Sequence, residues 1–359
     1  MEITAYLKMC EERRASDLHL LTGEPPVLRV NGALQRTDRP ALSEAELARM
    51  LLGLMSDTQR AAFERDSDLN MALTYPGFDR YRVNIHRQRG AVEAAFRRIP
   101  AAIPTLDLLG LPKVVGELAM KPNGLVLVTG PVGTGKSTTM AAMVDLINSK
   151  RDSLIVTIED PIEYLHRNNK SFVVQREVYS DTPSFSMALK NALRQDPNVI
   201  VVGEMRDLET ISTALTAAET GHLVLATLHT PNAAQSIQRI IDVFPAAQQM
   251  QVRTQLANTL QGVVSQLLLP DALRVGRVLA TEILVVTPAL RNLIRQNQIE
   301  QIGSFLQTGG KLGMQTMAKS LTDLVRAGKI ECELAKEQVT DPEDVTCPIC
   351  CGDGKLENV

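Results

Sequence analysis

Residues 130–138 have the types and spacing of a phosphate-binding loop. They read GPVGTGKST, which matches Gly, four residues, Gly, Lys and then Ser or Thr. Glycines here let backbone N–H groups turn towards phosphate oxygens at the positive end of the next helix. Lys136 would reach the β- and γ-phosphates of ATP, and the Ser137 hydroxyl would ligate Mg²⁺. The nucleotide contacts that the loop predicts are Gly130, Val132, Gly133, Thr134, Gly135, Lys136, Ser137 and Thr138.

Two acidic residues have the sequence context of a water-activating site. Glu204 ends the apolar run VIVVGE, where P-loop enzymes place an acid that holds Mg²⁺ together with the loop hydroxyl. Glu163 ends the segment TIEDPIE, in which Pro161 forces a turn. A carboxylate at Glu163 would align and deprotonate the attacking water. A solvated acidic turn is the alternative interpretation of this segment.

Histidine and arginine supply the remaining candidate groups. His229 follows the run HLVLATL, and an imidazole at the end of a strand can sense the γ-phosphate by hydrogen bonding. Arg82 and Arg97 each follow an aromatic residue, Tyr81 and Phe96, so each arginine should face away from that ring. Many P-loop enzymes neutralise transition-state charge with an arginine from another domain or subunit, although arginines on strands are more often solvated.

The cysteines indicate reduced thiols rather than a disulfide framework. There are five, an odd number, and four of them lie within the last thirty residues. Cys347 and Cys350 have the spacing of half a zinc site, and Cys332 and Cys351 could complete four ligands. No second pair at matching distance follows, so a thiol-rich tail is favoured over a metal site.

Strands that alternate with helices predict an α/β fold. The apolar runs LVLVTG, LIVTIED, VIVVGE and HLVLAT are separated by helical segments, which implies right-handed crossovers and a buried parallel sheet. The candidate polar residues follow these runs, and ligands bind at the carboxyl ends of such strands. Beyond Pro245 the pattern predicts mainly helix, with Thr287 and Pro288 at one helix start.

The length of 359 residues predicts two domains. Residues 1–99 combine two capping boxes, beginning at Ser43 and Ser56, with strand patterns at 80–85 and 91–99, which indicates a small α+β domain. Three prolines among residues 100–112 predict a linker. The ATPase domain is then 113–359, with a helical C-terminal region and the cysteine-containing tail.

The composition argues against nucleic acid as a partner and against a membrane-spanning or secreted chain. A formal net charge of -3, 3% aromatic residues and no tryptophan argue against nucleic-acid binding, which needs basic surfaces and stacking platforms. The N-terminus lacks the apolar core of a signal peptide, and no segment approaches the length of a membrane span. These features predict a cytoplasmic protein.

Four segments together resemble the secretion-type ATPases and, within that superfamily, the type IV pilus retraction ATPases. They are ASDLHL at 15–20, the aspartate box TIEDPIE, the Walker B segment LRQDPNVIVVGEMRDLET and the histidine box TGHLVLATLHT. The resemblance implies a PAS-like first domain, a RecA-like P-loop ATPase domain with a parallel sheet, and a hexameric ring. It implies that Glu163 is the catalytic glutamate and Glu204 the Walker B acid. It also implies that His222 and His229 serve the nucleotide, and that Arg82 and Arg97 are sensing arginines.

The same resemblance implies a motor that uses ATP and Mg²⁺ to drive pilus retraction and twitching motility. Its implied partners are five further copies of the chain, a platform protein of the inner membrane at the pilus base, and a paralogous retraction ATPase. Segments 289–296 and 313–317, ALRNLIRQ and GMQTM, resemble the C-terminal retraction signatures. In the first of these, Leu290, Leu293 and Ile294 share one helical face, and Arg291 and Arg295 should point outward.

Three alternatives stay open at this point. A pilus assembly or type II secretion ATPase would carry a longer N-terminal region and a tetracysteine zinc insertion, but no cysteine lies between Cys10 and Cys332. A nucleotide-gated scaffold would bind ATP without turnover, which an ATPase assay would reveal. A GTPase is disfavoured because no NKxD-type guanine reader is present.

Overall fold

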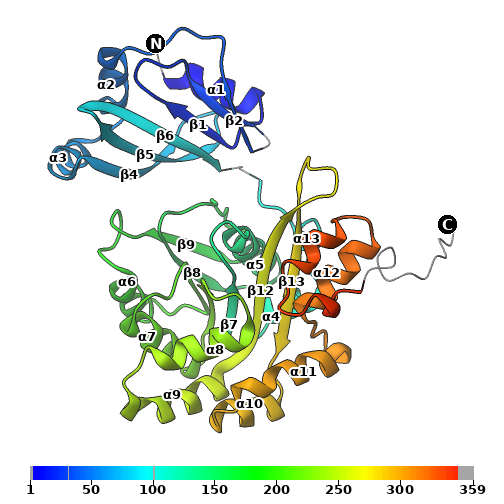
Figure 1. The fold of residues 1–359 in the computed structure, drawn as a ribbon. Coiled ribbons are helices and arrows are strands. Elements are labelled where there is room, and N and C mark those ends of the chain that lie inside the picture. Colours follow the sequence, from blue (N-terminus) through cyan, green and yellow to red (C-terminus); the bar gives the residue numbers. More distant parts are fainter. Residues whose placement is uncertain (1–2, 31, 100–101, 347–359) are drawn as a thin grey trace, which may run out of the picture. The chain divides into compact units, whose positions relative to one another are not determined.

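The computed structural model describes residues 3–30, 32–99 and 102–346, and its packing divides the chain into two units (Figure 1). The N-terminal unit takes in Met1–Ala102 and Pro161–Leu165, and the C-terminal unit takes in Ile103–Asp160 and His166–Val359. The predicted boundaries at 99/100 and 112/113 stay predictions. No motif or spacing predicted that residues 161–165 would pack with the first unit.

The N-terminal unit is built on an antiparallel sheet with strand order β3-β2-β1-β6-β5-β4. Helices α1, α2 and α3 and the apolar faces of the strands share one hydrophobic core, around Leu18, Leu47 and Phe96. Its elements are α1 (Ile3–Glu12), β1 (Asp17–Leu20), β2 (Val27–Val30), β3 (Ala33–Arg36), α2 (Glu44–Leu52), α3 (Asp57–Asp66), β4 (Asp68–Thr74), β5 (Arg80–Gln88) and β6 (Ala91–Ile99).

Local sequence explains these elements. Both predicted capping boxes are present: the side chain of Ser43 accepts from the backbone N–H of Glu46, and that of Ser56 accepts from Gln59. In β5 every second residue is buried, which directs Tyr81 into the core and places Arg82 on the opposite face. The small α+β unit predicted from the sequence is confirmed.

The C-terminal unit contains a seven-stranded sheet with strand order β13-β12-β7-β11-β10-β8-β9. All adjacent pairs are parallel except β12 with β13. Its elements are α4 (Lys113–Ala119), β7 (Gly124–Thr129), α5 (Lys136–Lys150), β8 (Leu154–Glu159), β9 (Phe172–Glu177), α6 (Phe185–Ala192), β10 (Val199–Val202), α7 (Leu208–Glu219), β11 (Leu223–Leu228), α8 (Ala233–Asp242), α9 (Ala246–Thr259), β12 (Leu260–Pro270), β13 (Arg277–Val285), α10 (Pro288–Arg295), α11 (Ile302–Thr308), α12 (Met317–Arg326) and α13 (Cys332–Lys336).

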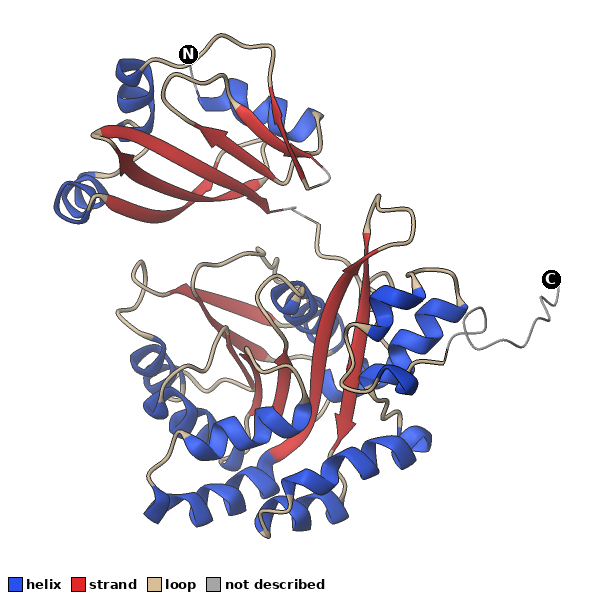
Figure 2. Ribbon diagram, in the orientation of Figure 1, coloured by secondary structure: helices blue, strands red, loops and turns tan. Residues whose placement is uncertain are grey.

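Helices cover both faces of this sheet (Figure 2). Along β7, Leu125 and Leu127 pack in one core cluster with α6 to α11, whereas Val126 and Val128 pack in another with α4 and α5. A strand that is buried on both faces needs a continuous apolar run, which is the pattern that predicted these strands. The α/β class with a mainly parallel sheet is therefore confirmed.

The prediction that the chain beyond Pro245 is mainly helical is wrong in one respect. The segments LQGVVSQLLLP and RVLATEILV form β12 and β13, and β13 runs antiparallel at the edge of the sheet. Strand β12 begins at Leu260, the residue directly after the last residue of α9, so no Gly or Pro marks the change. The edge strand β9 was also not predicted.

Helix α10 confirms one prediction and corrects another. The side chain of Thr287 caps the helix, Pro288 is its first residue, and Leu290, Leu293 and Ile294 are buried. Arg291, however, does not simply point outward. Its Nη1 donates to the backbone carbonyls of Ala257 and Asn258 near the end of α9, at 2.5 and 2.6 Å.

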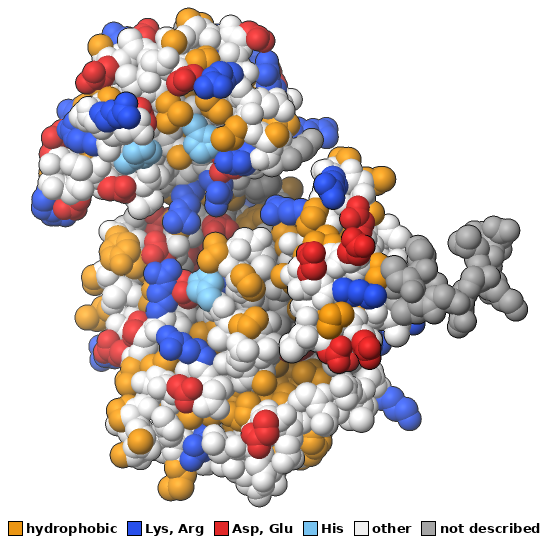
Figure 3. Space-filling model, in the orientation of Figure 1, with side chains coloured by type: hydrophobic (Ala, Val, Ile, Leu, Met, Phe, Trp, Pro, Cys, Tyr) orange, Lys and Arg blue, Asp and Glu red, His pale blue; other side chains and the backbone are white. Residues whose placement is uncertain are grey.

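Two further predictions concern the cysteine-containing tail and the absence of a membrane span. Cys347, Cys350 and Cys351 lie beyond the described residues, so the interpretation of the tail stays a prediction. Within the described ranges, no helix combines the length and the apolar character needed to cross a bilayer. On the face shown in Figure 3, positive and negative side chains are interspersed over each unit.

Candidate nucleotide site

The loop between β7 and α5 has the backbone geometry that phosphate binding requires. Strand β7 ends at Thr129 and α5 begins at Lys136, so residues 130–135 form the turn between them. Gly130, Gly133 and Gly135 have φ angles of 140°, 83° and 84°, in the region that favours glycine. A side chain at Gly130 would also clash, because its Cβ would lie 2.4 Å from the carbonyl oxygen of Gln266.

Lys136 is held at the mouth of this loop. Its side chain is buried, and its ammonium donates to the carbonyl oxygens of Gly130 and Pro131 at 2.7 and 2.8 Å. The same nitrogen lies 3.3 Å from Nδ1 of His229. Exchanging the neutral carbonyl oxygens for anionic phosphate oxygens would strengthen the contacts of the ammonium, because donor and acceptor would then both be charged.

His229 joins Lys136 to the acidic side of the site. Its Nε2 lies 3.0 Å from Oε1 of Glu204, and the other carboxylate oxygen of Glu204 pairs with Arg206 at 2.7 Å. Burial of Glu204 opposes ionisation, but hydrogen bonds from Arg206 and His229 outweigh it and lower the pKa of this carboxyl below its ordinary value. Glu204 is therefore a carboxylate at neutral pH.

The sheet topology explains why these residues meet. Strand β11 lies between β7 and β10, and all three run parallel. Leu228 lies across from Thr129, so His229 emerges beside the start of the phosphate loop. Strand β10 ends at Val202, so Glu204 is the second residue after the strand and lies at the same edge of the sheet.

His222 is not brought to this edge. It precedes β11, and its backbone carbonyl accepts from the N–H of Gly124 at the opposite end of β7. Its ring lies 3.0 Å from the carbonyl of Ala217 and 3.2 Å from the hydroxyl of Thr220. At about 3.3 Å per residue, the strand separates His222 from His229 by about 20 Å. The nucleotide role implied for His222 has no support from the geometry of its own subunit.

The remaining predicted residues belong to the N-terminal unit. Arg82 and Arg97 lie directly across from each other on β5 and β6. Arg97 is paired within its own unit, because its Nε donates to a carboxylate oxygen of Asp17 at 2.9 Å. The half-buried Glu163 lies in the segment 161–165, and the guanidinium of Arg80 donates to the carbonyl of Ile162 there at 3.1 Å.

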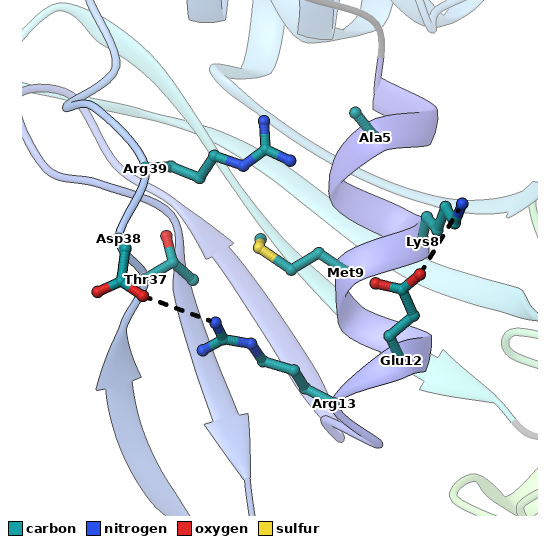
Figure 4. A pocket seen from close by; sticks show the side chains of 8 residues that line it. All are labelled: Ala5, Lys8, Met9, Glu12, Arg13, Thr37, Asp38 and Arg39. Carbon is teal, nitrogen blue, oxygen red and sulfur yellow. Dashed lines mark ion pairs between the residues drawn. The ribbon is translucent and has the colours of Figure 1, made fainter.

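One residue of the site was missed. Arg206 contributes the shortest contact to Glu204, but it lies in a loop two residues further on, where no spacing rule identifies it. A separate cavity of about 410 Å³ lies in the N-terminal unit, between α1 and the loop after β3 (Figure 4). None of the predicted nucleotide residues line this cavity, so it is separate from the candidate nucleotide site.

A glycine-rich loop joins a buried parallel strand to a helix, and its lysine contacts a histidine that pairs with an acid from the neighbouring strand. This arrangement defines a P-loop nucleoside triphosphatase. Comparison with protein families then identifies which one. The Type II/IV secretion system protein family matches residues 2–336, and the chain belongs to that family.

Individual relatives agree with this assignment. The chain is 48% identical over 344 residues to the type IV pilus retractation ATPase PilT of Pseudomonas aeruginosa, covering 96% of this chain and 100% of that protein. It is 40% identical to the type IV pilus ATPase PilU of the same organism, covering 98% and 92%. A crystal structure of the pilus retraction motor PilT with bound ADP superposes with a TM-score of 0.89 at 47% identity, covering 96% and 98%. The resemblance inferred from the sequence motifs is confirmed.

Proposed function

We propose that this chain is an ATP-hydrolysing motor that drives type IV pilus retraction. The observation that carries the proposal is the linked set of Lys136, His229 and Glu204 at the phosphate loop. Relatives that match over nearly the whole chain are named as a retraction ATPase and a pilus ATPase, and one solved relative binds ADP. The nucleotide is therefore proposed to be ATP.

Mg²⁺ fits the donors that the site offers. Within the described part of the chain, no group of three or more His, Cys, Asp or Glu side chains could enclose a metal ion. Nucleotide enzymes do not need such a cage, because Mg²⁺ is bound mainly by phosphates and water with one or two protein oxygens. The exposed hydroxyl of Ser137 and the carboxylate of Glu204 would be those oxygens. The ion would supply charge neutralisation between the phosphates.

Different side chains would bind the phosphates, activate the water and sense the γ-phosphate. Loop N–H groups and the ammonium of Lys136 would bind and orient the β- and γ-phosphates. Glu163 would take a proton from the attacking water. His229 would hydrogen-bond the γ-phosphate while it stays joined to Glu204, so the Walker B acid would sense the state of the nucleotide.

The proposal also includes a role for Arg82 and Arg97 and a hexameric assembly. Arg82 and Arg97 would stabilise developing charge on the nucleotide of a neighbouring copy in a homohexamer. Before Arg97 could do so, it would have to leave Asp17. We place the hexamer at the cytoplasmic side of the pilus base, against an inner-membrane platform protein, with a paralogue like PilU as a further partner.

A deletion strain tests the direction of work. We expect surface pili to remain or increase while twitching and pilus shortening stop. Re-expression of the wild-type chain should restore both. A strain without pili would instead identify an assembly motor, and an unchanged strain would reject a role in pili.

A further inference from the structure

Gln266 on β12 contacts both ends of the phosphate loop. In the parallel pair of β12 and β7, Ser265 lies across from Thr129, so Gln266 lies beside Gly130, the first residue of the loop. Its backbone carbonyl is the atom that a Cβ at Gly130 would strike. At the other end, Nε2 of Gln266 donates to Oγ1 of Thr139 at 2.6 Å, and Thr139 is the fourth residue of α5.

A second buried contact joins the same two strands. The hydroxyl of Thr129 donates to the hydroxyl of Ser265 at 2.9 Å, and both residues are fully buried. Strand β12 is thus bonded to the strand that enters the loop and to the helix that leaves it. The loop between these two points is held against β12 as one piece.

Packing alone does not account for an amide at this position. Gln266 is 1% exposed, and its Oε1 is buried without a hydrogen-bond partner among the described residues. A buried amide costs free energy unless its hydrogen bonds are made. Val263 and Val264 on the same strand fill their space with apolar groups. The hydrogen bond from the amide of Gln266 to Thr139, in the first turn of α5, gives a reason for a polar side chain at this position.

We propose that Gln266 is a positioning residue that clamps α5 to β12, so that Lys136 and the loop N–H groups keep the arrangement that the β- and γ-phosphates need. The inference rests on the proposed ATPase function and extends it. Phosphoryl transfer depends almost entirely on positioning and electrostatics, so a small displacement of the loop weakens both nucleotide binding and turnover.

Two substitutions remove the same hydrogen bond from opposite sides. Gln266→Met keeps the length and burial of the side chain but removes the donor, and Thr139→Val keeps the shape but removes the acceptor. Each should raise the Kd for ADP by roughly three- to tenfold and lower kcat. The double variant should lose no more than either single variant, because the shared contact is already gone.

Matched controls lie at the other end of β12 and at the last residue of α9, directly before it. Gln261→Met changes a glutamine of the same strand, and Thr259→Val removes a buried hydroxyl that donates to the carbonyl of Gln255. Both controls should leave the ADP affinity and kcat at wild-type values. Thermal melting without nucleotide, measured on all variants, reports any general loss of structure.

Two outcomes would contradict the role of Gln266 as a clamp. One is wild-type ADP affinity and kcat in both Gln266→Met and Thr139→Val, even if their melting temperatures fall. Another is an additive loss in the double variant. The measurement of ADP affinity does not depend on hydrolysis. A wild-type chain that binds ADP but does not turn over ATP would contradict the proposed function. The role of Gln266 would still be tested by the ADP affinities of the variants.

Discussion

At the scale of single residues, the site is a chain of contacts rather than a set of independent groups. Lys136 contacts His229, His229 contacts Glu204, and Glu204 contacts Arg206. Any ligand that draws the ammonium of Lys136 towards phosphate changes the surroundings of the histidine. The histidine would in turn change the hydrogen bonding of Glu204, which would couple phosphate binding to the acid that we propose as a ligand of Mg²⁺.

Replacing Lys136 with alanine should abolish turnover. The substitution removes the only side chain of the loop that places a full positive charge at its mouth, and a preorganised group of this kind contributes about a hundredfold or more in rate. ATP turnover by the purified variant is the measurement. A variant that keeps more than about a tenth of the wild-type rate would contradict the role of Lys136.

Glu163→Gln should separate binding from chemistry. The amide has nearly the same shape as the carboxylate but cannot accept a proton from water, so nucleotide affinity should stay near wild type while hydrolysis is lost. Affinity and turnover are measured on the same preparation. Wild-type turnover in this variant would remove Glu163 from the mechanism.

The lowered pKa of Glu204 makes a prediction about acid stability. A carboxyl whose pKa is depressed in the folded state contributes stability above its unfolded value, near 4.5, and this contribution is lost as the pH falls through the folded pKa. The melting temperature of wild type should therefore exceed that of Glu204→Gln at neutral pH. The difference should shrink below pH 4.5. A difference that does not change with pH would contradict this assignment.

Sequence motifs predicted most of this site, for a physical reason. The loop and Glu204 follow buried strands, and the carboxyl ends of parallel strands meet at one edge. The same rule favours His229, which follows β11, over His222, which precedes it. Arg206 and the pairing of Arg97 with Asp17 could not be predicted, because both depend on three-dimensional contacts that no local spacing encodes.

At the scale of elements, apolar runs predicted the central strands because both faces of those strands are buried. Strand β9 was missed because it lies at the edge of the sheet, where Phe172 and Val174 are exposed and no continuous buried run results. Strand β12 was missed because it carries buried polar residues, Ser265 and Gln266, which interrupt the apolar pattern.

The two arginines of α10 should differ in their effect on stability. Arg291 donates to two backbone carbonyls near the end of α9, whereas the exposed Arg295 donates to the side chain of Asn258. Arg291→Ala should lower the free energy of unfolding by about 1 kcal/mol, and Arg295→Ala by less than about half of that. Urea unfolding of both variants checks this. Equal losses would contradict a special role of Arg291 as a cap.

At the scale of the whole molecule, the role proposed for Arg82 and Arg97 requires residues of the first unit to serve the nucleotide of a neighbouring copy. Co-expression of Arg82→Ala with Lys136→Ala tests this supply. In mixed rings, a Lys136→Ala subunit still carries the arginine that an Arg82→Ala neighbour lacks. The mixture should therefore turn over ATP faster than either variant alone.

Two controls accompany the mixing experiment. Each variant is also mixed with itself, which should give no recovery, and the oligomeric state of all samples is measured by light scattering. A hexamer that shows no recovery in the mixture would contradict an arginine supplied by the neighbour. A monomer with full activity would contradict the ring itself.

If ATP hydrolysis at this site shortens pili, the shortening can be followed as pilus length over time in living cells. The deletion strain is complemented with the wild-type chain or with Glu163→Gln, at equal protein levels. We expect pili to shorten with the wild-type chain, and with Glu163→Gln to be assembled without shortening. Shortening at the wild-type rate with a variant shown to be unable to hydrolyse ATP would contradict this expectation.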